Sequence, residues 1–252
     1  MPRPKELCKI KLLKKSLNKL NKLYQDIPET KGCMENLPRC QAWCCSIQSP
    51  SLLFVEFMNV WDNILHDYST KEIVGLIKGA VNNYVFFRPD AGCIFFDRNT
   101  KYCMCHKYRP YNCRIYGITP EDEFTLRYER FKEQYKDEMY DIRDQCSLVE
   151  VRNGQKVTTN DTNKWWERLC KIEHYFGVSK SNINDAPDGT YRNFHDHLLL
   201  FLFPDDLLSR LTMLRLNRDL PKEEKKKCIE SFIDCLYGII EKMKNISDED
   251  SD

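Results

Sequence analysis

The sequence predicts a mainly α protein, in which a bundle-like helical scaffold surrounds an irregular cysteine-rich metal-binding region with little β structure. Apolar residues recur at helical spacing in several segments, and helix-start signals precede three of them. Between these segments, residues 33–146 contain nine of the 13 cysteines, in loops without apolar periodicity. Because such loops cannot order themselves by burial alone, we expect a bound metal to order them.

Residues 1–27 are the first unit, a basic amphipathic helix over about residues 5–25. One face is apolar, and residues 1–31 hold nine Lys or Arg against three Asp or Glu. We expect the apolar stripe to be buried and the lysines to be solvated. The alternative is that this helix contacts an acidic partner. The stripe consists of Leu7, Ile10, Leu13, Leu17, Leu20 and Tyr24.

Residues 28–146 are predicted to form the cysteine-cluster domain. Ser49-Pro50 is expected to open a helix that runs to about Leu65, and the capping box at Ser69 to start one that runs to about Asn83. In the second cysteine region, 92–117, the run from Cys93 to Phe96 resembles a short strand. Thr119-Pro120 then begins a long charged helix.

Residues 147–246 are predicted to be a helical region that packs on the cysteine-cluster domain. The sequence of residues 147–158 is consistent with a small hairpin around Asn153-Gly154. Helices are expected at about 162–176, 205–216 and 222–244. Residues 247–252 are an acidic tail that we expect to be disordered.

Composition limits the classes of function. The start, Met-Pro-Arg-Pro-Lys-Glu, lacks the apolar core of a secretory signal, and an odd number of cysteines argues against a closed disulfide set. We therefore expect a cytoplasmic protein, where clustered cysteines bind metal more often than they form bridges. The net charge of +1 gives no signal for nucleic acid, and no apolar run is long enough to span a membrane.

The clustered cysteines are the candidate metal ligands, because thiolates are soft donors that select zinc, copper(I) or iron–sulfur clusters. The adjacent pair Cys44-Cys45 favours an iron–sulfur cluster over a single zinc ion, since neighbouring side chains rarely both reach one ion. Helical cysteines such as Cys170, Cys228 and Cys235 are expected to be core residues. His195 and His197 diverge on a helix, which argues against ligation. The candidates are the nine cysteines between residues 33 and 146.

The second group reads Cys93-Ile-Phe-Phe-Asp97, then Cys103-Met-Cys105-His106, then Arg109-Pro110-Tyr-Asn-Cys113-Arg114. With Cys40-x3-Cys44-Cys45 before it, this arrangement resembles the YkgJ-type cysteine-cluster family of zinc- or iron-chelating proteins, whose pattern is C-x2-C-x2/3-C-C, C-x-F-L-D and R-P-x-x-C-R. The resemblance covers about residues 33–146. It implies an iron–sulfur or zinc centre with Cys146 as the late cysteine. The ligands that it implies are Cys40, Cys44, Cys45, Cys93, Cys103, Cys113 and Cys146, with Cys33 and Cys105, which depart from the pattern, as further candidates.

Arg109 and Arg114 suit an anionic thiolate cluster, because a guanidinium can donate to sulfur and offset its charge. We therefore expect an iron–sulfur protein that serves electron transfer or a cluster-dependent modification of a protein or small molecule. Some flagellin lysine methylases have a similar cysteine set, so a methylase-like enzyme is conceivable by analogy alone. The alternative is a zinc-stabilised interaction module without catalysis.

Overall fold

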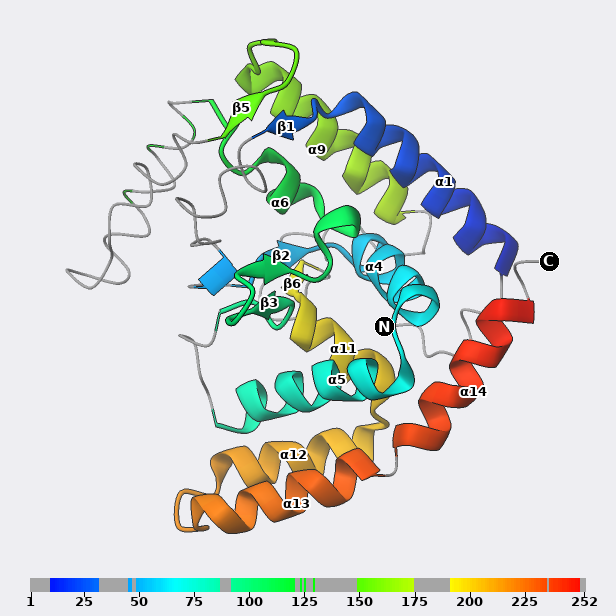
Figure 1. Cartoon of the computed structure of the whole chain (residues 1–252), viewed down its shortest axis with the longest axis vertical. Helices are drawn as coiled ribbons and strands as arrows, with labels where there is room; N and C mark the ends of the chain where they lie inside the picture. The colour runs from blue at the N-terminus through cyan, green and yellow to red at the C-terminus, as the bar shows by residue number, and fades with distance from the viewer. Residues whose placement is uncertain are drawn as a thin grey trace.

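The structure is a computed structural model, and it confirms a mainly α fold with little β structure (Figure 1). Helices form most of the described chain, and the strands are three antiparallel pairs of two residues each. The residues that it describes are 10–31, 45–46, 49–86, 92–120, 123, 125, 129, 149–174, 191–234 and 236–249.

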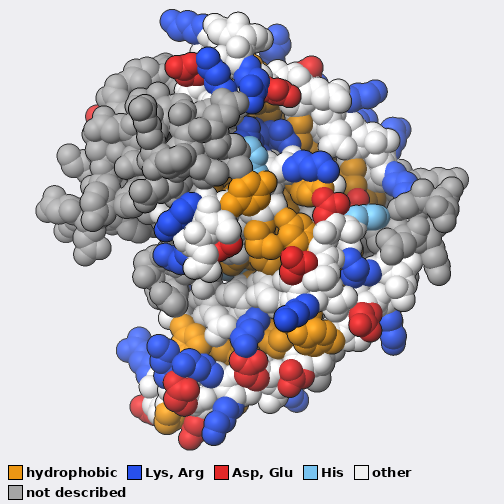
Figure 2. Space-filling model, in the orientation of Figure 1, with side chains coloured by type: hydrophobic (Ala, Val, Ile, Leu, Met, Phe, Trp, Pro, Cys, Tyr) orange, Lys and Arg blue, Asp and Glu red, His pale blue; other side chains and the backbone are white. Residues whose placement is uncertain are grey.

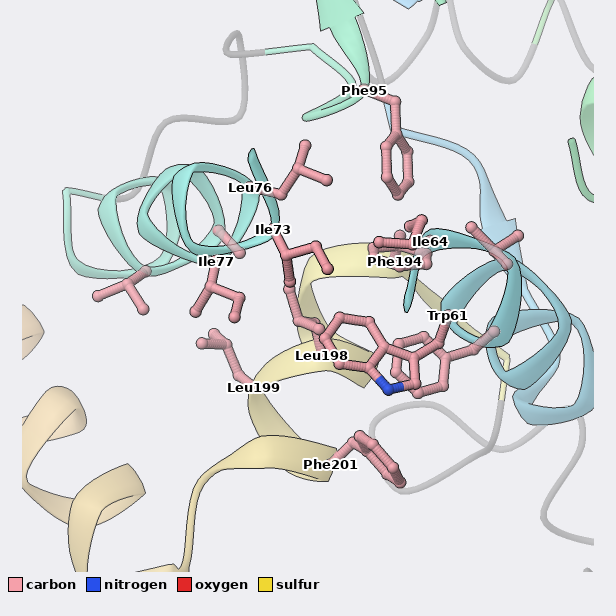
Figure 3. Packing of buried hydrophobic residues seen from close by; sticks show 14 of the residues in the cluster. Trp61, Ile64, Ile73, Leu76, Ile77, Phe95, Phe194, Leu198, Leu199 and Phe201 are labelled. Atoms are coloured by element: carbon pink, nitrogen blue, oxygen red, sulfur yellow. The ribbon is translucent and has the colours of Figure 1, made fainter. Parts of the chain in front are cut away.

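The larger apolar core lies between α4 (Phe54–Asp67), α5 (Thr70–Val85) and α11 (Phe194–Leu202). Figure 3 shows Trp61 and Ile64 of α4, Ile73 and Ile77 of α5, and Leu198 and Phe201 of α11 around a shared interior. α11 was not predicted as a helix. Its residues Leu198–Leu202 are all apolar, so no alternation with polar residues indicates a helical period. A helix that is apolar on most sides is typical of a buried position.

Three more helices pack on α5 or on α4. They are α12 (Asp205–Leu216), α13 (Lys222–Asp234) and α14 (Leu236–Glu249). α12 has the predicted bounds. The single helix predicted over 222–244 is wrong, because α13 and α14 run in clearly different directions (Figure 1).

A second apolar cluster joins α1 (Ile10–Asp26) to α9 (Thr159–His174), and the first turn of α4 contacts both. Leu20 and Tyr24 of α1 are buried there, as the apolar stripe predicts, whereas Lys14 and Lys15 are exposed. Figure 2 shows Lys and Arg side chains along the edge where α1 lies in Figure 1. Leu7 and residues 250–252 of the predicted acidic tail lie outside the described residues, whereas residues 247–249, predicted to be disordered, continue α14.

The short strands correct two predicted boundaries. β2 (Ser51–Leu52) pairs with β6 (Arg192–Asn193), so α4 begins at Phe54 and not at Ser49-Pro50. β5 (Glu150–Val151) pairs with β1 (Thr30–Lys31), and not with a strand that follows Gly154. In both cases a distant partner in the chain overrides the local signal. α5, by contrast, begins after Ser69, whose side chain accepts the N–H of Glu72 as the capping box predicts.

Candidate metal centre

The structure describes five of the predicted cysteines, and the thiols of three of them, Cys45, Cys103 and Cys105, are in contact. Cys103 ends β4 (Tyr102–Cys103) and Cys105 precedes the 3-10 turn His106–Tyr108, with 3.7 Å between their sulfur atoms. The thiol of Cys45 hydrogen-bonds to Cys103. Cys93 donates its backbone N–H to the carbonyl oxygen of Cys45 at 2.8 Å. The charges of Cys93 and of Cys113, on α6 (Tyr111–Ile115), both act on Cys105.

Gly92 makes the approach of Cys93 to Cys45 possible. Its backbone φ is +72°, a conformation that residues other than glycine rarely adopt. A Cβ at this position would lie 2.5 Å from the backbone oxygen of Ser46 and 2.7 Å from that of Cys45. Only glycine therefore fits where these two cysteine segments meet.

A tight hairpin places Cys103 beside the other thiols. β3 (Phe96–Asp97) pairs with β4, so Phe96 lies opposite Cys103. The Asp97 carboxylate closes the turn by accepting the N–H of Asn99 and the hydroxyl of Thr100, each at 2.8 Å. The side chain of Asp97 is thus used by the turn. From the same hairpin, the Phe95 ring packs against Phe194 with 4.5 Å between ring centroids, which fixes the cysteine-rich segment on the larger core (Figure 3).

The electrostatics of the cluster favour one thiolate next to one thiol. Hydrogen bonds from Cys105 and Cys45 hold the pKa of Cys103 well below its usual value. The same bond, together with burial, raises the pKa of Cys105. A thiolate at Cys103 is the form that binds metals. The hydrogen bonds between these thiols therefore favour the thiolate at Cys103 over the thiolate at Cys105.

The two predicted arginines have different surroundings. Arg109 donates from Nη1 to Nε2 of His106 at 2.6 Å and from Nη2 to Oγ1 of Thr30 at 3.1 Å. Burial and the charge of Arg109 lower the pKa of His106, which favours the neutral imidazole that this bond needs. Arg114 instead lies over the Tyr24 ring, with Cζ 4.1 Å from the centroid.

The remaining predicted ligands, Cys33, Cys40, Cys44 and Cys146, lie outside the described residues. Among the residues that are described, no group of three or more Cys, His, Asp or Glu side chains is arranged to hold a metal ion. The five described cysteines match an iron–sulfur cluster or zinc in donor type, but they are not arranged as a ligand set. A complete ligand set would need the cysteines of segments 32–44 or 141–148.

Cys170 and His197, on later helices, lie in apolar surroundings and not among the clustered cysteines. Cys170, on α9, packs against the second apolar cluster, and burial raises its pKa to about 11. That environment disfavours the thiolate a metal would need. His197 is fully buried, with Nε2 2.9 Å from the carbonyl oxygen of Leu52 and its ring stacked on Phe57. Both residues serve the packing of the core, as the sequence suggests.

Two buried carboxylates, Glu56 and Glu173, connect α4 with neighbouring elements. Glu56 accepts the hydroxyl of Tyr24 at 2.7 Å and the N–H of Tyr111 at 2.6 Å, so it links α1, α4 and α6. Glu173 accepts the N–H groups of Phe54 and Val55. Neither glutamate is among the residues predicted from the sequence, because a lone Glu in a helical pattern gives no sign of burial.

Comparisons with models of protein families, with curated proteins and with solved structures find no match to this chain. Within the described part of the chain, every helix is too short or too polar to cross a membrane.

Proposed function

We propose that this protein holds an iron–sulfur cluster and uses it for electron transfer or for a cluster-dependent modification reaction. The observation that carries the proposal is the contact between the thiols of Cys45, Cys103 and Cys105, which come from two separate segments, with Cys93 bonded through its backbone to Cys45. Thiols are the donor type that iron–sulfur clusters use. The cluster would be held by a subset of Cys40, Cys44, Cys45, Cys93, Cys103, Cys113 and Cys146, with Cys33 and Cys105 as further candidates.

The chain supplies features that such a centre needs. Cys93 and Cys105 are almost fully buried, which keeps bulk water away from their sulfur atoms. Hydrogen bonds from Cys105 and Cys45 lower the pKa of Cys103, which favours its thiolate. When bound, an iron–sulfur cluster supplies one-electron chemistry at a potential set by hydrogen bonds, charge and solvent exposure. The YkgJ-type resemblance supports the same class of centre, and it extends by analogy alone to a methylase-like enzyme acting on a protein or small molecule.

We propose that the protein is cytoplasmic, because clustered cysteines in a reducing compartment bind metal more often than they form bridges. The sulfur atoms of Cys103 and Cys105 lie 3.7 Å apart. In an oxidising compartment, thiols this close are at risk of forming bridges with each other or with neighbours. A labile metal–thiolate centre is favoured where thiols stay reduced.

Elemental analysis of anaerobically purified protein tests the proposal. We expect iron and acid-labile sulfide in near-equal amounts, together with visible absorption from thiolate-to-iron charge transfer. A second preparation made with excess zinc in the growth medium serves as the control for adventitious metal, and iron should persist in it. Stoichiometric zinc without sulfide would contradict the proposal.

That outcome would support the alternative, a zinc-stabilised interaction module without catalysis. The exposed lysines of α1, Lys14, Lys15 and Lys22, favour it, because the opposite side of the helix is already occupied by α9 and α4. In this alternative the lysine face would contact an acidic protein partner. Zinc protein is colourless and retains no sulfide, so the same analysis separates the two proposals.

A further inference from the structure

The thiols of Cys103 and Cys105 are in direct contact, and only one residue separates them in the chain. Their sulfur atoms lie 3.7 Å apart and share a hydrogen bond. Cys103 is half-buried, whereas Cys105 is only 4% exposed. The pair therefore has one more accessible member and one buried member.

Backbone hydrogen bonds hold both members of this pair in place. Cys103 ends β4, and the next residue, Met104, donates its N–H to the carbonyl oxygen of Phe95 at 2.8 Å. The carbonyl oxygen of Cys105 accepts the N–H of Tyr108 at 2.9 Å. To form a disulfide bond, the two sulfur atoms must approach from 3.7 Å to about 2.05 Å. Rotation of the two short side chains is a motion of this size, so the contact is close to a bonding arrangement.

We infer that Cys103 and Cys105 are a dithiol that a hydroperoxide oxidises to a disulfide, and that the sulfur of Cys103 reacts first. The inference goes beyond the proposed function, because it concerns only these two described thiols. Once the pair is oxidised, neither sulfur is available as a metal ligand. The reaction therefore belongs to the metal-free protein.

The oxidation takes place in two steps. In the first, the Cys103 sulfur attacks one oxygen of hydrogen peroxide, the O–O bond breaks, and the thiol proton leaves with the other oxygen as water, which makes Cys103 a sulfenic acid. In the second, the Cys105 sulfur attacks the Cys103 sulfur, the S–O bond breaks, and the hydroxyl leaves with the Cys105 proton as a second water. The two sulfur atoms thus give up two electrons, and the peroxide is reduced to water.

Burial and chain connectivity assign the two roles. Cys103 is the more exposed thiol, so peroxide reaches it more easily than it reaches Cys105. Cys45 also hydrogen-bonds to Cys103 and is the competing partner for the second step. Cys105, however, is in the same segment as Cys103, and a partner tethered by one residue has the higher effective concentration.

Peptide mass spectrometry of the full-length protein tests this inference. Iron and sulfide are measured first, and the metal is then removed with a chelator under reducing conditions. After removal of the reductant, circular dichroism records the helix content, hydrogen peroxide is added, and the remaining thiols are alkylated. Trypsin releases residues 102–107, which include both cysteines. We expect this peptide to be lighter by two hydrogen atoms and to carry no alkyl group.

Cys170 and Cys228, half-buried thiols on α9 and α13, are the internal controls. At one equivalent of peroxide, we expect at least about tenfold more disulfide in peptide 102–107 than at either control, because only this pair has an intramolecular partner in the same segment. In Cys105→Ser, or in Cys105→Ala where serine lowers the helix content, the sulfenic acid at Cys103 should persist and be labelled by dimedone.

Three results would overturn the inference: a main product that links Cys103 to Cys45, oxidation of peptide 102–107 no greater than that of the controls, or no dimedone label at Cys103 in the Cys105 variants. Loss of helix content on removal of the metal would also contradict it, because the contact between the two thiols needs no metal. Iron and sulfide are measured before peroxide is added, so a missing cluster contradicts the proposed function and leaves this test intact.

Discussion

Glu173 and Val55 lie 118 residues apart, and the Glu173 carboxylate accepts the backbone N–H of Val55 at 2.8 Å. The N–H of Phe54 donates to the other oxygen at 3.0 Å. These are the first two residues of α4, whose N-cap, Leu53, has no capping side-chain hydrogen bond. A buried helix start leaves N–H groups that need acceptors, and a carboxylate is favoured there by the helix dipole. α9 thus completes the N-terminus of α4.

We predict that Glu173→Gln destabilises the fold by about 2 kcal/mol, because one of the two buried donors loses its acceptor. Urea unfolding followed by circular dichroism measures this free energy. Glu167→Gln, on the exposed side of the same helix, is the matched control and should change stability by less than about 0.5 kcal/mol. Equal effects of the two substitutions would contradict the capping role.

This contact shows why the sequence predicts some elements and misses others. The start of α5 at Thr70 depends on Ser69 and Glu72, which are three residues apart. This signal can be recognised in the local sequence. The start of α4 depends on β6 and on α9, which are far away in the chain. Tertiary partners therefore overrode the local signal at Ser49-Pro50.

The prediction of which face of the last helices is buried was wrong for a related reason. A single continuous helix over 222–244 places Cys228, Phe232 and Ile239 on one inward face. In the structure Ile239 is 48% exposed and Ile240 is fully buried. Because α13 ends at Asp234 and α14 begins at Leu236, the period counted through this junction gives the wrong face for α14.

The stability of the fold should depend on pH through Glu56. Burial raises the pKa of Glu56, and hydrogen bonds from Tyr111, Tyr24 and Leu53 and the charge of Arg114 oppose that effect without cancelling it. A carboxyl with a raised pKa holds its proton more tightly in the folded chain. Its contribution is therefore fully present below the unfolded pKa of about 4.3, and is lost as pH rises through the folded value.

Unfolding free energies of the unmodified protein and of Glu56→Gln, measured from pH 4 to pH 8, check this prediction. The variant cannot titrate at position 56, so the stability advantage of the unmodified protein should shrink as pH rises. Other titrating groups contribute equally to both curves. A difference that stays constant, or grows with pH, would show that the raised pKa is wrong.

Gly92 should be essential to the candidate centre. Gly92→Ala adds a Cβ that would meet backbone oxygen atoms of Ser46 and Cys45, at a positive φ that alanine disfavours. We expect a loss of more than 1 kcal/mol in stability, and reduced metal content because Cys93 moves away from Cys45. Thermal unfolding and metal analysis of the same sample measure both.

Gly75→Ala is the matched control for that substitution. Gly75 lies within α5, and a Cβ there meets nothing within 4 Å. Alanine should stabilise this helix by up to about 1 kcal/mol and leave the metal content unchanged. If Gly92→Ala behaves like Gly75→Ala, the close approach of the two cysteine segments is not needed for metal binding.

The site was predictable in part. Clustering and the family resemblance select Cys45, Cys93, Cys103 and Cys113, and the structure places the thiols of Cys45 and Cys103 in contact with each other and with Cys105. The roles of the two arginines could not be separated from the sequence, because they depend on contacts with Thr30 and Tyr24 in distant segments. The same holds for Glu56 and Glu173, whose burial results from the packing of α9 and α1 on α4.

The most direct test of the central claim is the iron and sulfide content of single cysteine variants purified anaerobically. Cys93→Ser and Cys113→Ser each replace a soft thiolate with a hard hydroxyl, and should lose most of the iron, the sulfide and the dithionite-bleachable absorption. Cys170→Ser, which alters a thiol on α9 with a pKa raised to about 11, should retain all three. The same metal content in all three variants would contradict the assignment of the ligands, and with it the proposal that these cysteines hold a cluster.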